Sequence, residues 1–285
     1  MNLFIYRHKI ERLILLLAIL VSCTIINSCE NVPDLTQSNS LILEGYLYAN
    51  EPIEHIKLTK IVSFDSEESE KSPVNDADVQ LIHDDKYYLL VKAEGDSGFY
   101  YYPDNDLEIK EGETYSIIAE AEGITISAST TVPEAPINLM ASNYSIQLPQ
   151  ISSQRELAEA REYYYNTVDI TWTNENSEYF YLIIQNVESN PESINISNRF
   201  SWSYSFITEP TSQDSYTMES FFQIQQFGMH EITLYKVNQE YVDLYETLKT
   251  DSRSFTGAIS NVKNGLGIFT ALTGSKIYVN VEKAE

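Results

Sequence analysis

Cysteine, basic residues, glycine and proline are all scarce in this chain of 285 residues. It has 2 cysteines, 10 glycines and 9 prolines, and its 18 Lys and Arg stand against 42 Asp and Glu, a formal net charge of −24. Two cysteines cannot build a disulfide scaffold, and so little glycine and proline excludes a collagen-like or low-complexity chain. The excess of acid repels phosphate backbones, which excludes the usual nucleic-acid binder.

Apolar and aromatic residues, in contrast, are plentiful. Hydrophobic residues make up 43% of the sequence, which includes 21 Tyr and 11 Phe. This content is enough to bury the core of one large domain or of two ordinary ones.

Residues 1–28 have the pattern of a secretory signal. The basic residues Arg7, Lys9 and Arg12 precede the uncharged run 13–26. That run is shorter than the roughly 20 apolar residues that a membrane-spanning helix needs, so a cleaved signal is favoured over a signal anchor.

The apolar run ends at cysteine, as in bacterial lipoproteins whose mature chain begins at an acylated cysteine. Cys23 follows the better local sequence, whereas Cys29 lies where the polar segment begins. We expect the lipid on Cys29, with Cys23 as the alternative, and a tether over residues 29–40. A mature chain that begins at Cys29 has no second cysteine, and therefore no internal disulfide and no cysteine-based metal or nucleophile site.

Short segments of alternating polar and apolar residues follow, as is typical of β-strands. Their spacing predicts an immunoglobulin-like β-sandwich over residues 41–135, with hairpin turns at Asp84-Asp85 and Glu122-Gly123. The acidic segment 65–76 is expected to be an exposed loop. The seven expected strands are 41–48, 54–62, 77–83, 86–92, 98–102, 114–121 and 124–132.

A junction with two prolines, residues 132–139, leads to a second β-sandwich-like domain, expected over 136–285. We expect a helix near 239–249, capped by Asn238, and a shorter helix at 154–162, so the chain is mostly β with one or two short helices. Gly265 and Gly267 are expected to make a tight bend with close backbone packing before the closing strand. The expected strands are 166–173, 178–187, 199–207, 219–227, 230–237, 264–269 and 276–281.

Several segments, in order and spacing, resemble a Bacteroidota family of outer-membrane lipoproteins known as domain-of-unknown-function family 4249. The resemblance implies a lipid on Cys29 and genes that often adjoin those of TonB-dependent receptors, but it supplies no catalytic residue. The acids Glu30 and Asp34 after the cysteine favour display on the cell exterior. The matching segments are CENVPDL (29–35), LILEGYLY (41–48), ITISASTTVPEAPI (124–137), ITWTNENSEYFYLII (170–184) and SNVKNGLGIFTAL (260–272).

The sequence contains no convincing catalytic or metal-binding pattern. Residues 95–98, GDSG, resemble the surroundings of a protease nucleophile, but Phe99 replaces the second glycine and His55 lacks a suitable setting, so we interpret the segment as a turn. His83 and His230 also lie singly, without the spacing of a zinc site. We therefore expect no enzymatic activity, no metal and no cofactor.

Two tyrosine clusters are candidates for binding. Consecutive rings point to both sides of a strand or loop, so some must face solvent, where they serve as sugar-stacking platforms or protein-interface hot spots. The candidate binding surface comprises Tyr100, Tyr101, Tyr102, Tyr163, Tyr164 and Tyr165.

The leading hypothesis is a surface-exposed outer-membrane lipoprotein that serves as a non-catalytic accessory to a TonB-dependent receptor in nutrient capture or uptake. Its expected partners are the membrane, through the lipid, the receptor, and a glycan or peptide ligand; no nucleic acid is expected. One alternative is a stand-alone glycan- or glycoprotein-binding module, which aromatic rings on one exposed face would favour. The other is a structural adhesin or fimbrial-type subunit, which needs a sheet that accepts a donor strand.

Overall fold

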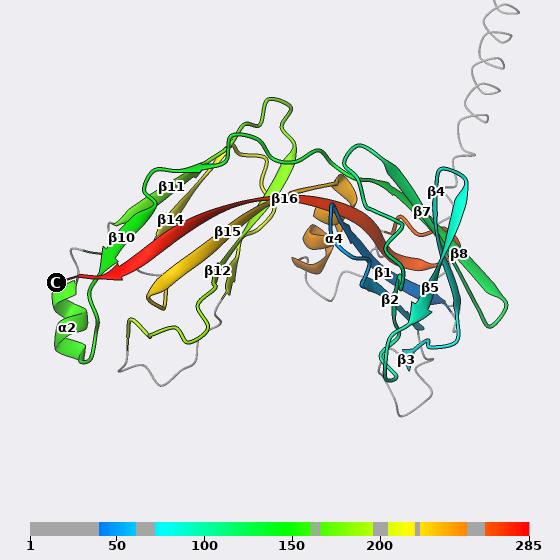
Figure 1. Cartoon of the computed structure of the whole chain (residues 1–285), viewed down its shortest axis with the longest axis horizontal. Helices are drawn as coiled ribbons and strands as arrows, with labels where there is room; N and C mark the ends of the chain where they lie inside the picture. Colours follow the sequence, from blue (N-terminus) through cyan, green and yellow to red (C-terminus); the bar gives the residue numbers. More distant parts are fainter. Residues whose placement is uncertain are drawn as a thin grey trace, which may run out of the picture. The chain divides into compact units, whose positions relative to one another are not determined.

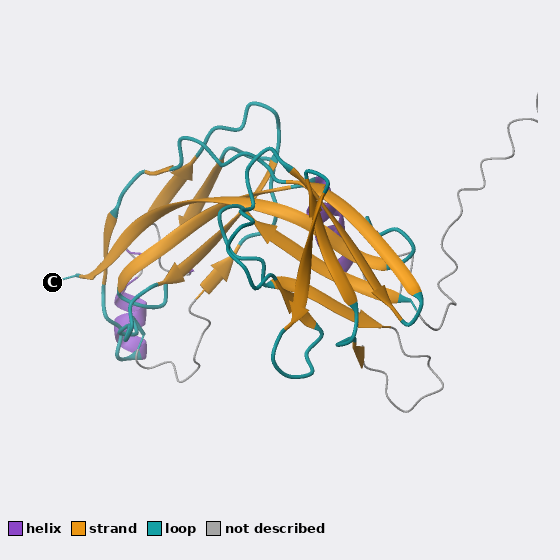
Figure 2. Ribbon diagram, turned by 45° about the vertical axis from the view of Figure 1, so that its right-hand side comes forward, coloured by secondary structure: helices purple, strands orange, loops and turns teal. Residues whose placement is uncertain are grey.

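The computed structural model describes residues 40–60, 72–160, 163, 166–195, 205–219, 223–249 and 260–284. These residues belong to one compact unit, Ser38–Glu285, and are mostly β, which confirms the predicted class (Figure 2). The helices described are α2 (Gln154–Glu159) and α4 (Gln239–Lys249), at the predicted places, and neither is long and apolar enough to cross a membrane. The predicted signal, the lipidated cysteine and all of the predicted tether except Ser40 lie outside the described residues.

One 13-stranded sheet runs through most of the described chain. Its main path has the order β13-β12-β15-β16-β1-β2-β6-β5-β4-β7-β8, with β3 paired to β2 and β10 paired to β16 (Figure 1). The first eight strands are β1 (Leu41–Tyr48), β2 (His55–Lys60), β3 (Ser72–Pro73), β4 (Asp78–His83), β5 (Lys86–Lys92), β6 (Phe99–Tyr101), β7 (Thr114–Ala121) and β8 (Ile124–Thr131). The later strands of this sheet are β10 (Ser145–Leu148), β12 (Tyr179–Asn186), β13 (Ser205–Ile207), β15 (Gly228–Val237) and β16 (Leu266–Lys283).

The hairpin turns of the first half are those the sequence predicts. Asp84 and Asp85 have φ of 49° and 60° and join β4 to β5, while Glu122 and Gly123 have φ of 54° and 77° and join β7 to β8. Two successive positive φ values match the type I′ turn, whose twist suits an antiparallel pair. The acidic loop is only partly described, and its end forms the short strand β3.

The alternation within these strands buries one face in a first core. Leu43, Leu58, Leu81, Tyr115 and Ile117 are fully buried members of this core. Phe269 and Ala271, from near the other end of the chain, belong to the same core. Residues 41–135 therefore do not complete their own core, and the boundary expected at 135–136 divides one compact unit.

The reason is that β16 (Leu266–Lys283) is a single strand of 18 residues, so the separate closing strand expected at 276–281 is wrong. The expected bend lies just before this strand, at Asn264 and Gly265, where Asn264 has a φ of 58°, whereas Gly267 lies within the strand. Residues from Leu266 to Leu272 pair in parallel with β1, and those from Leu272 to Val281 pair in antiparallel fashion with β15. Gly267 has a φ of 106° and pairs with Leu43, and a Cβ built on it would lie 2.0 Å from the Leu43 carbonyl oxygen. Glycine is required here for close approach within a continuous strand.

A second core lies between β12, β15 and β16 and a three-stranded sheet of β14 (Ser215–Glu219), β11 (Thr167–Thr171) and β9 (Met140–Ala141). The strand expected at 219–227 is wrong, because the strand ends at Glu219. Ile224 and Phe227 are buried in the core without belonging to a strand. The Asn186 amide donates to the Phe227 carbonyl at 2.9 Å, which anchors the chain just before β15 begins. Of the strand expected at 199–207, the structure describes Ser205–Ile207 as β13.

A third, aromatic cluster attaches α4 to the sheet. Tyr241 of the helix stacks on Tyr181 of β12 with ring centroids 5.3 Å apart, and Tyr181 stacks on Tyr235 of β15 at the same distance. Tyr48 of β1 meets Tyr235 edge to face at 5.7 Å. Asn238 precedes the helix as expected, but its side-chain nitrogen donates to Thr130 and Thr131 of β8 and so joins the helix start to the first core.

Candidate functional site

Four large apolar side chains are exposed side by side on β5 and β6. Tyr87 and Leu89 of β5 are 66% and 56% exposed, and Phe99 and Tyr101 of β6 are 37% and 36% exposed. They alternate with Tyr88, Leu90 and Tyr100, which point inward and pack in or against the first core. We call the four exposed residues the aromatic face.

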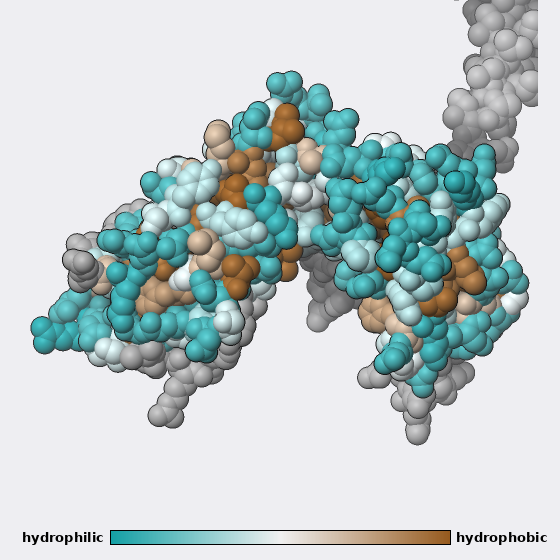
Figure 3. Space-filling view, viewed as in Figure 1, coloured by the Kyte–Doolittle hydropathy of each residue, from teal (hydrophilic) through white to brown (hydrophobic). Residues whose placement is uncertain are grey.

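Side chains of β5 itself and of the neighbouring strands extend this face. Val91 of β5 pairs directly with Tyr101, and the half-buried Ile82 of β4 pairs with Tyr87. The ammonium group of Lys57 on β2 lies 5.2 Å from the Phe99 ring centroid, a cation–π contact. Figure 3 shows apolar side chains at the surface in the part of the molecule that contains β5. A contiguous apolar patch on a protein surface is typical of an interaction site.

The predicted tyrosine surface is only partly realised. Tyr101 is on the aromatic face, but Tyr100 is 1% exposed, so its place in a binding surface is wrong. The period-two alternation of β6 turns Tyr100 inward, where its hydroxyl donates to the Val74 carbonyl at 2.9 Å. Tyr102 is half-buried, and its hydroxyl donates to Asp106.

The second predicted tyrosine cluster contributes no exposed ring among the described residues. Tyr163 is half-buried and packs against the second core. Tyr164 and Tyr165 lie outside the described residues. The sequence patterns did not identify Tyr87, Leu89 and Phe99 as exposed. The segment KYYLLVK nevertheless indicates exposure, because its apolar residues occupy both odd and even positions of the strand. A sheet that buries only one face must leave one of these two sets in solvent.

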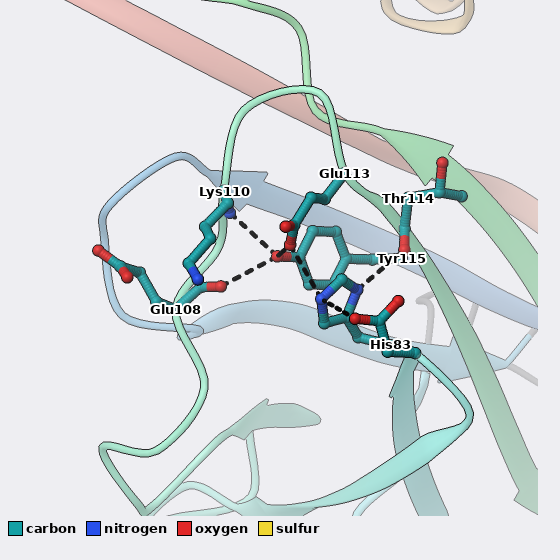
Figure 4. Close-up of polar contacts among 7 residues, drawn as sticks. His83, Glu108, Lys110, Glu113, Thr114 and Tyr115 are labelled. Atoms are coloured by element: carbon teal, nitrogen blue, oxygen red, sulfur yellow. Dashed lines mark hydrogen bonds and ion pairs between the residues drawn. The ribbon is translucent and has the colours of Figure 1, made fainter.

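His83, at the end of β4, lies in a small polar cluster (Figure 4). Its Nε2 lies 2.9 Å from Glu113 Oε2 and 3.6 Å from Asp84 Oδ2, and its Nδ1 lies 3.3 Å from the Thr114 carbonyl oxygen. The imidazole also stacks on the Tyr115 ring with centroids 4.4 Å apart. These contacts join the end of β4 to the start of β7.

The Tyr115 hydroxyl fixes the chain that precedes β7. It donates to the Glu108 carbonyl at 2.9 Å and accepts from the Lys110 amide at 3.0 Å. Burial raises the pKa of Tyr115 to about 12, although the bond from the Lys110 amide acts in the opposite direction. The phenol therefore stays neutral and serves as a structural connector in this cluster.

The other predicted chemistry-bearing residues lie apart. Residues 95–98 form a turn with positive φ at Gly95 and Gly98, as predicted. Among the residues that the structure describes, Ser97 has no hydrogen bond to a histidine, and no three His, Cys, Asp or Glu side chains are grouped to hold a metal ion. His55 is exposed beside Tyr48, and His230 is 4% exposed, where burial lowers the pKa of its imidazole.

A polar network joins β15 and β16 on one face of the 13-stranded sheet. Glu231 of β15, 9% exposed, accepts hydrogen bonds from Lys276 at 3.1 Å and from Tyr278 at 3.0 Å. Burial alone would raise the pKa of Glu231, but these bonds outweigh it and the pKa is lowered. The same contact raises the pKa of Lys276.

The chain belongs to the family described as "Domain of unknown function (DUF4249)", which matches residues 30–277. No curated protein sequence matches the chain.

Solved structures with some likeness come from tandem-domain proteins of low sequence identity. The FN1 to FN3 domains of chicken CNTN1 are 11% identical, with a TM-score of 0.28 over 86% of this chain and 67% of theirs. A structure of consecutive titin domains is 11% identical, with a TM-score of 0.21 over 86% of this chain and 66% of its own. A second titin structure is 9% identical, with a TM-score of 0.20 over 86% of this chain and 96% of its own. With TM-scores of 0.28 or less, these structures do not establish the fold of this chain.

Proposed function

We propose that this protein is an outer-membrane lipoprotein, displayed on the cell exterior, which docks through its aromatic face onto a TonB-dependent receptor and assists nutrient capture or uptake without catalysis. The observation that carries the proposal is the exposure of Tyr87, Leu89, Phe99 and Tyr101 on neighbouring strands. Tyrosine and other aromatic side chains are enriched in the hot spots of protein interfaces.

The charged residues around the aromatic face indicate which partner surface would be complementary to it. The aromatic face is bordered by acids in the β4–β5 turn, in the β5–β6 connection and at the paired positions of β4 and β7. They are Asp84, Asp85, Glu94, Asp96, Asp78 and Glu120. Lys57 and Lys92 also border this face, and Lys92 Nζ lies 3.3 Å from Asp96 Oδ1, so the rim is mixed with an excess of acid. An apolar centre with such a rim complements a protein surface with an apolar centre and a mainly basic rim.

The rest of the proposal comes from the sequence. The signal-like segment would direct export, and a lipid on Cys29 would attach the protein to the membrane. The family resemblance indicates the receptor as partner. A lipid at the start of the mature chain would hold the folded part near the membrane, where a weak interface suffices because the partners are already concentrated.

A second candidate function, a glycan-binding module, is favoured by the exposed rings of Tyr87 and Tyr101. In that case the aromatic face would bind sugar rings by stacking and would need no receptor.

Co-purification tests the first proposal. The tagged lipoprotein is isolated from its own outer membrane in mild detergent, as the natural chain and as the double variant Tyr87→Ser, Leu89→Ser. A matched control, Ile137→Ser with Ile207→Ser, removes two side chains that are each 59% exposed elsewhere.

We expect a TonB-dependent receptor near one-to-one with the natural chain and the control, and at least about tenfold less with the face variant, since a hot-spot side chain contributes about 2 kcal/mol. Equal recovery with the face variant would refute docking through this face. Recovery of the lipoprotein alone in every case would refute the receptor.

A further inference from the structure

A second candidate site is an open groove of about 500 Å³ with a mixed polar and apolar lining, which we call the junction groove. Its volume lies within the range of small-molecule sites, roughly 300–1,000 Å³. Its walls come from the residues after β8, the β11–β12 loop, and the end of β15 with the start of α4. They comprise 131–134, 176–179 and 236–239, together with Gly112.

The walls are held in place by the protein's own hydrogen bonds. Asn174 closes the β11–β12 loop, because its side-chain oxygen accepts from the Glu178 amide and its nitrogen donates to the Glu178 carbonyl, both at 2.9 Å. On the opposite wall, the Asn238 amide donates to the Thr131 carbonyl at 2.9 Å. A site with fixed walls loses little conformational entropy when a ligand enters.

An ion pair between a largely buried lysine side chain and a carboxylate is the main polar feature of the groove. The Lys236 side chain is 13% exposed, and its Nζ lies 2.7 Å from Glu178 Oε1. An ammonium has three donors, so the ion pair leaves it able to donate further. Asn176 and Ser177, both exposed, add an amide and a hydroxyl beside it.

We propose that the junction groove binds a neutral saccharide. Sugar hydroxyls both donate and accept hydrogen bonds, which matches a lining that offers an ammonium, a carboxylate, amides and hydroxyls together. The Tyr179 ring and Pro133 supply apolar surface for the less polar face of a sugar ring.

The charges in the groove argue for a neutral ligand. Glu178 already neutralises Lys236, and Glu134 adds a second carboxylate, so an anionic ligand meets net repulsion. The groove lies outside the aromatic face, so saccharide binding does not depend on receptor docking. Within the proposed function, a neutral saccharide would be the nutrient that is captured.

A glycan array with the full-length protein in mild detergent tests this inference. The array carries neutral oligosaccharides of glucose, xylose, mannose and galactose, next to oligosaccharides that contain uronic acids. The tightest neutral oligosaccharide is then titrated against the natural chain, Lys236→Met and Asn176→Ala. Asn105→Ala, an exposed asparagine outside the groove, is the matched control.

We expect binding to at least one neutral oligosaccharide and none to the uronic-acid series. Loss of a hydrogen bond from a charged group should weaken binding about tenfold or more in Lys236→Met, and loss of a neutral one about fivefold in Asn176→Ala, with no change in the control. Asn176→Ala alters an exposed side chain, so it remains informative if Lys236→Met folds poorly.

Three results would overturn the inference: no neutral oligosaccharide bound, only acidic ones bound, or equal affinity in both groove variants and the control. Because no receptor is present in this assay, each of these results leaves docking through the aromatic face unaffected. Binding that is lost in the Tyr87→Ser, Leu89→Ser variant instead would assign the saccharide to the aromatic face.

Discussion

Replacing Gly267 by alanine should destabilise the protein far more than the same change at Gly112. Both glycines have positive φ, 106° and 75°. A Cβ at Gly112 would meet nothing within 4 Å, whereas a Cβ at Gly267 would lie 2.0 Å from the Leu43 carbonyl oxygen. Gly112→Ala therefore measures the backbone cost alone, about 1–2 kcal/mol.

Gly267→Ala adds a steric cost. Strand β16 must move away from β1 by about 1 Å or more to reach normal contact, which weakens the hydrogen bonds next to this position at about 1 kcal/mol each. The total expected loss is about 3–5 kcal/mol, a large part of the 5–15 kcal/mol that stabilises a typical domain. Urea denaturation followed by tyrosine and tryptophan fluorescence measures both variants. Equal losses at the two positions would show that β16 does not pass so close to β1.

Three further predictions concern titratable and hydrogen-bonding groups. Tyr115→Phe should lower the free energy of unfolding by about 1–3 kcal/mol in urea denaturation, because it leaves two backbone groups unpaired; an unchanged midpoint would contradict the connector role. Burial, with Glu44 and a neighbouring tyrosine, raises the pKa of Tyr46 from 10 to about 12, so stability that is complete below pH 10 should fall as the pH rises from 10 to 12. Denaturation midpoints that stay level over that interval would refute this. Since the pKa of Glu231 is lowered in the folded state, its contribution is present above its unfolded pKa of about 4.5 and is lost as the pH falls below it; Glu231→Gln should therefore reduce stability at pH 7 more than at pH 3.

Local patterns in the sequence predict much of the fold. Alternation locates the strands of the first half within one or two residues, and Asp84-Asp85 and Glu122-Gly123 form the turns expected of them. The helix expected near 239–249 likewise matches α4. Each of these features depends on contacts between residues that are close in sequence, which is the information that such patterns carry.

The sequence patterns do not predict which distant segments pair with one another. The paired glycines predict close backbone packing, but not that Gly267 would approach Leu43, because this depends on the position of β1, more than two hundred residues earlier. The aromatic face was missed for a similar reason. Tyr87, Tyr88, Leu89 and Leu90 are all apolar, so only the completed sheet shows which of them face solvent.

Site-specific photo-cross-linking in living cells tests the central claim most directly. Leu89, at the centre of the aromatic face, is replaced by the photo-reactive benzoylphenylalanine, and Ile207 on β13 is replaced in a matched control. We predict a covalent adduct with a TonB-dependent receptor from position 89 and none from position 207. An adduct from position 207 alone, or none from position 89 while the lipoprotein is displayed on the surface, would contradict the account.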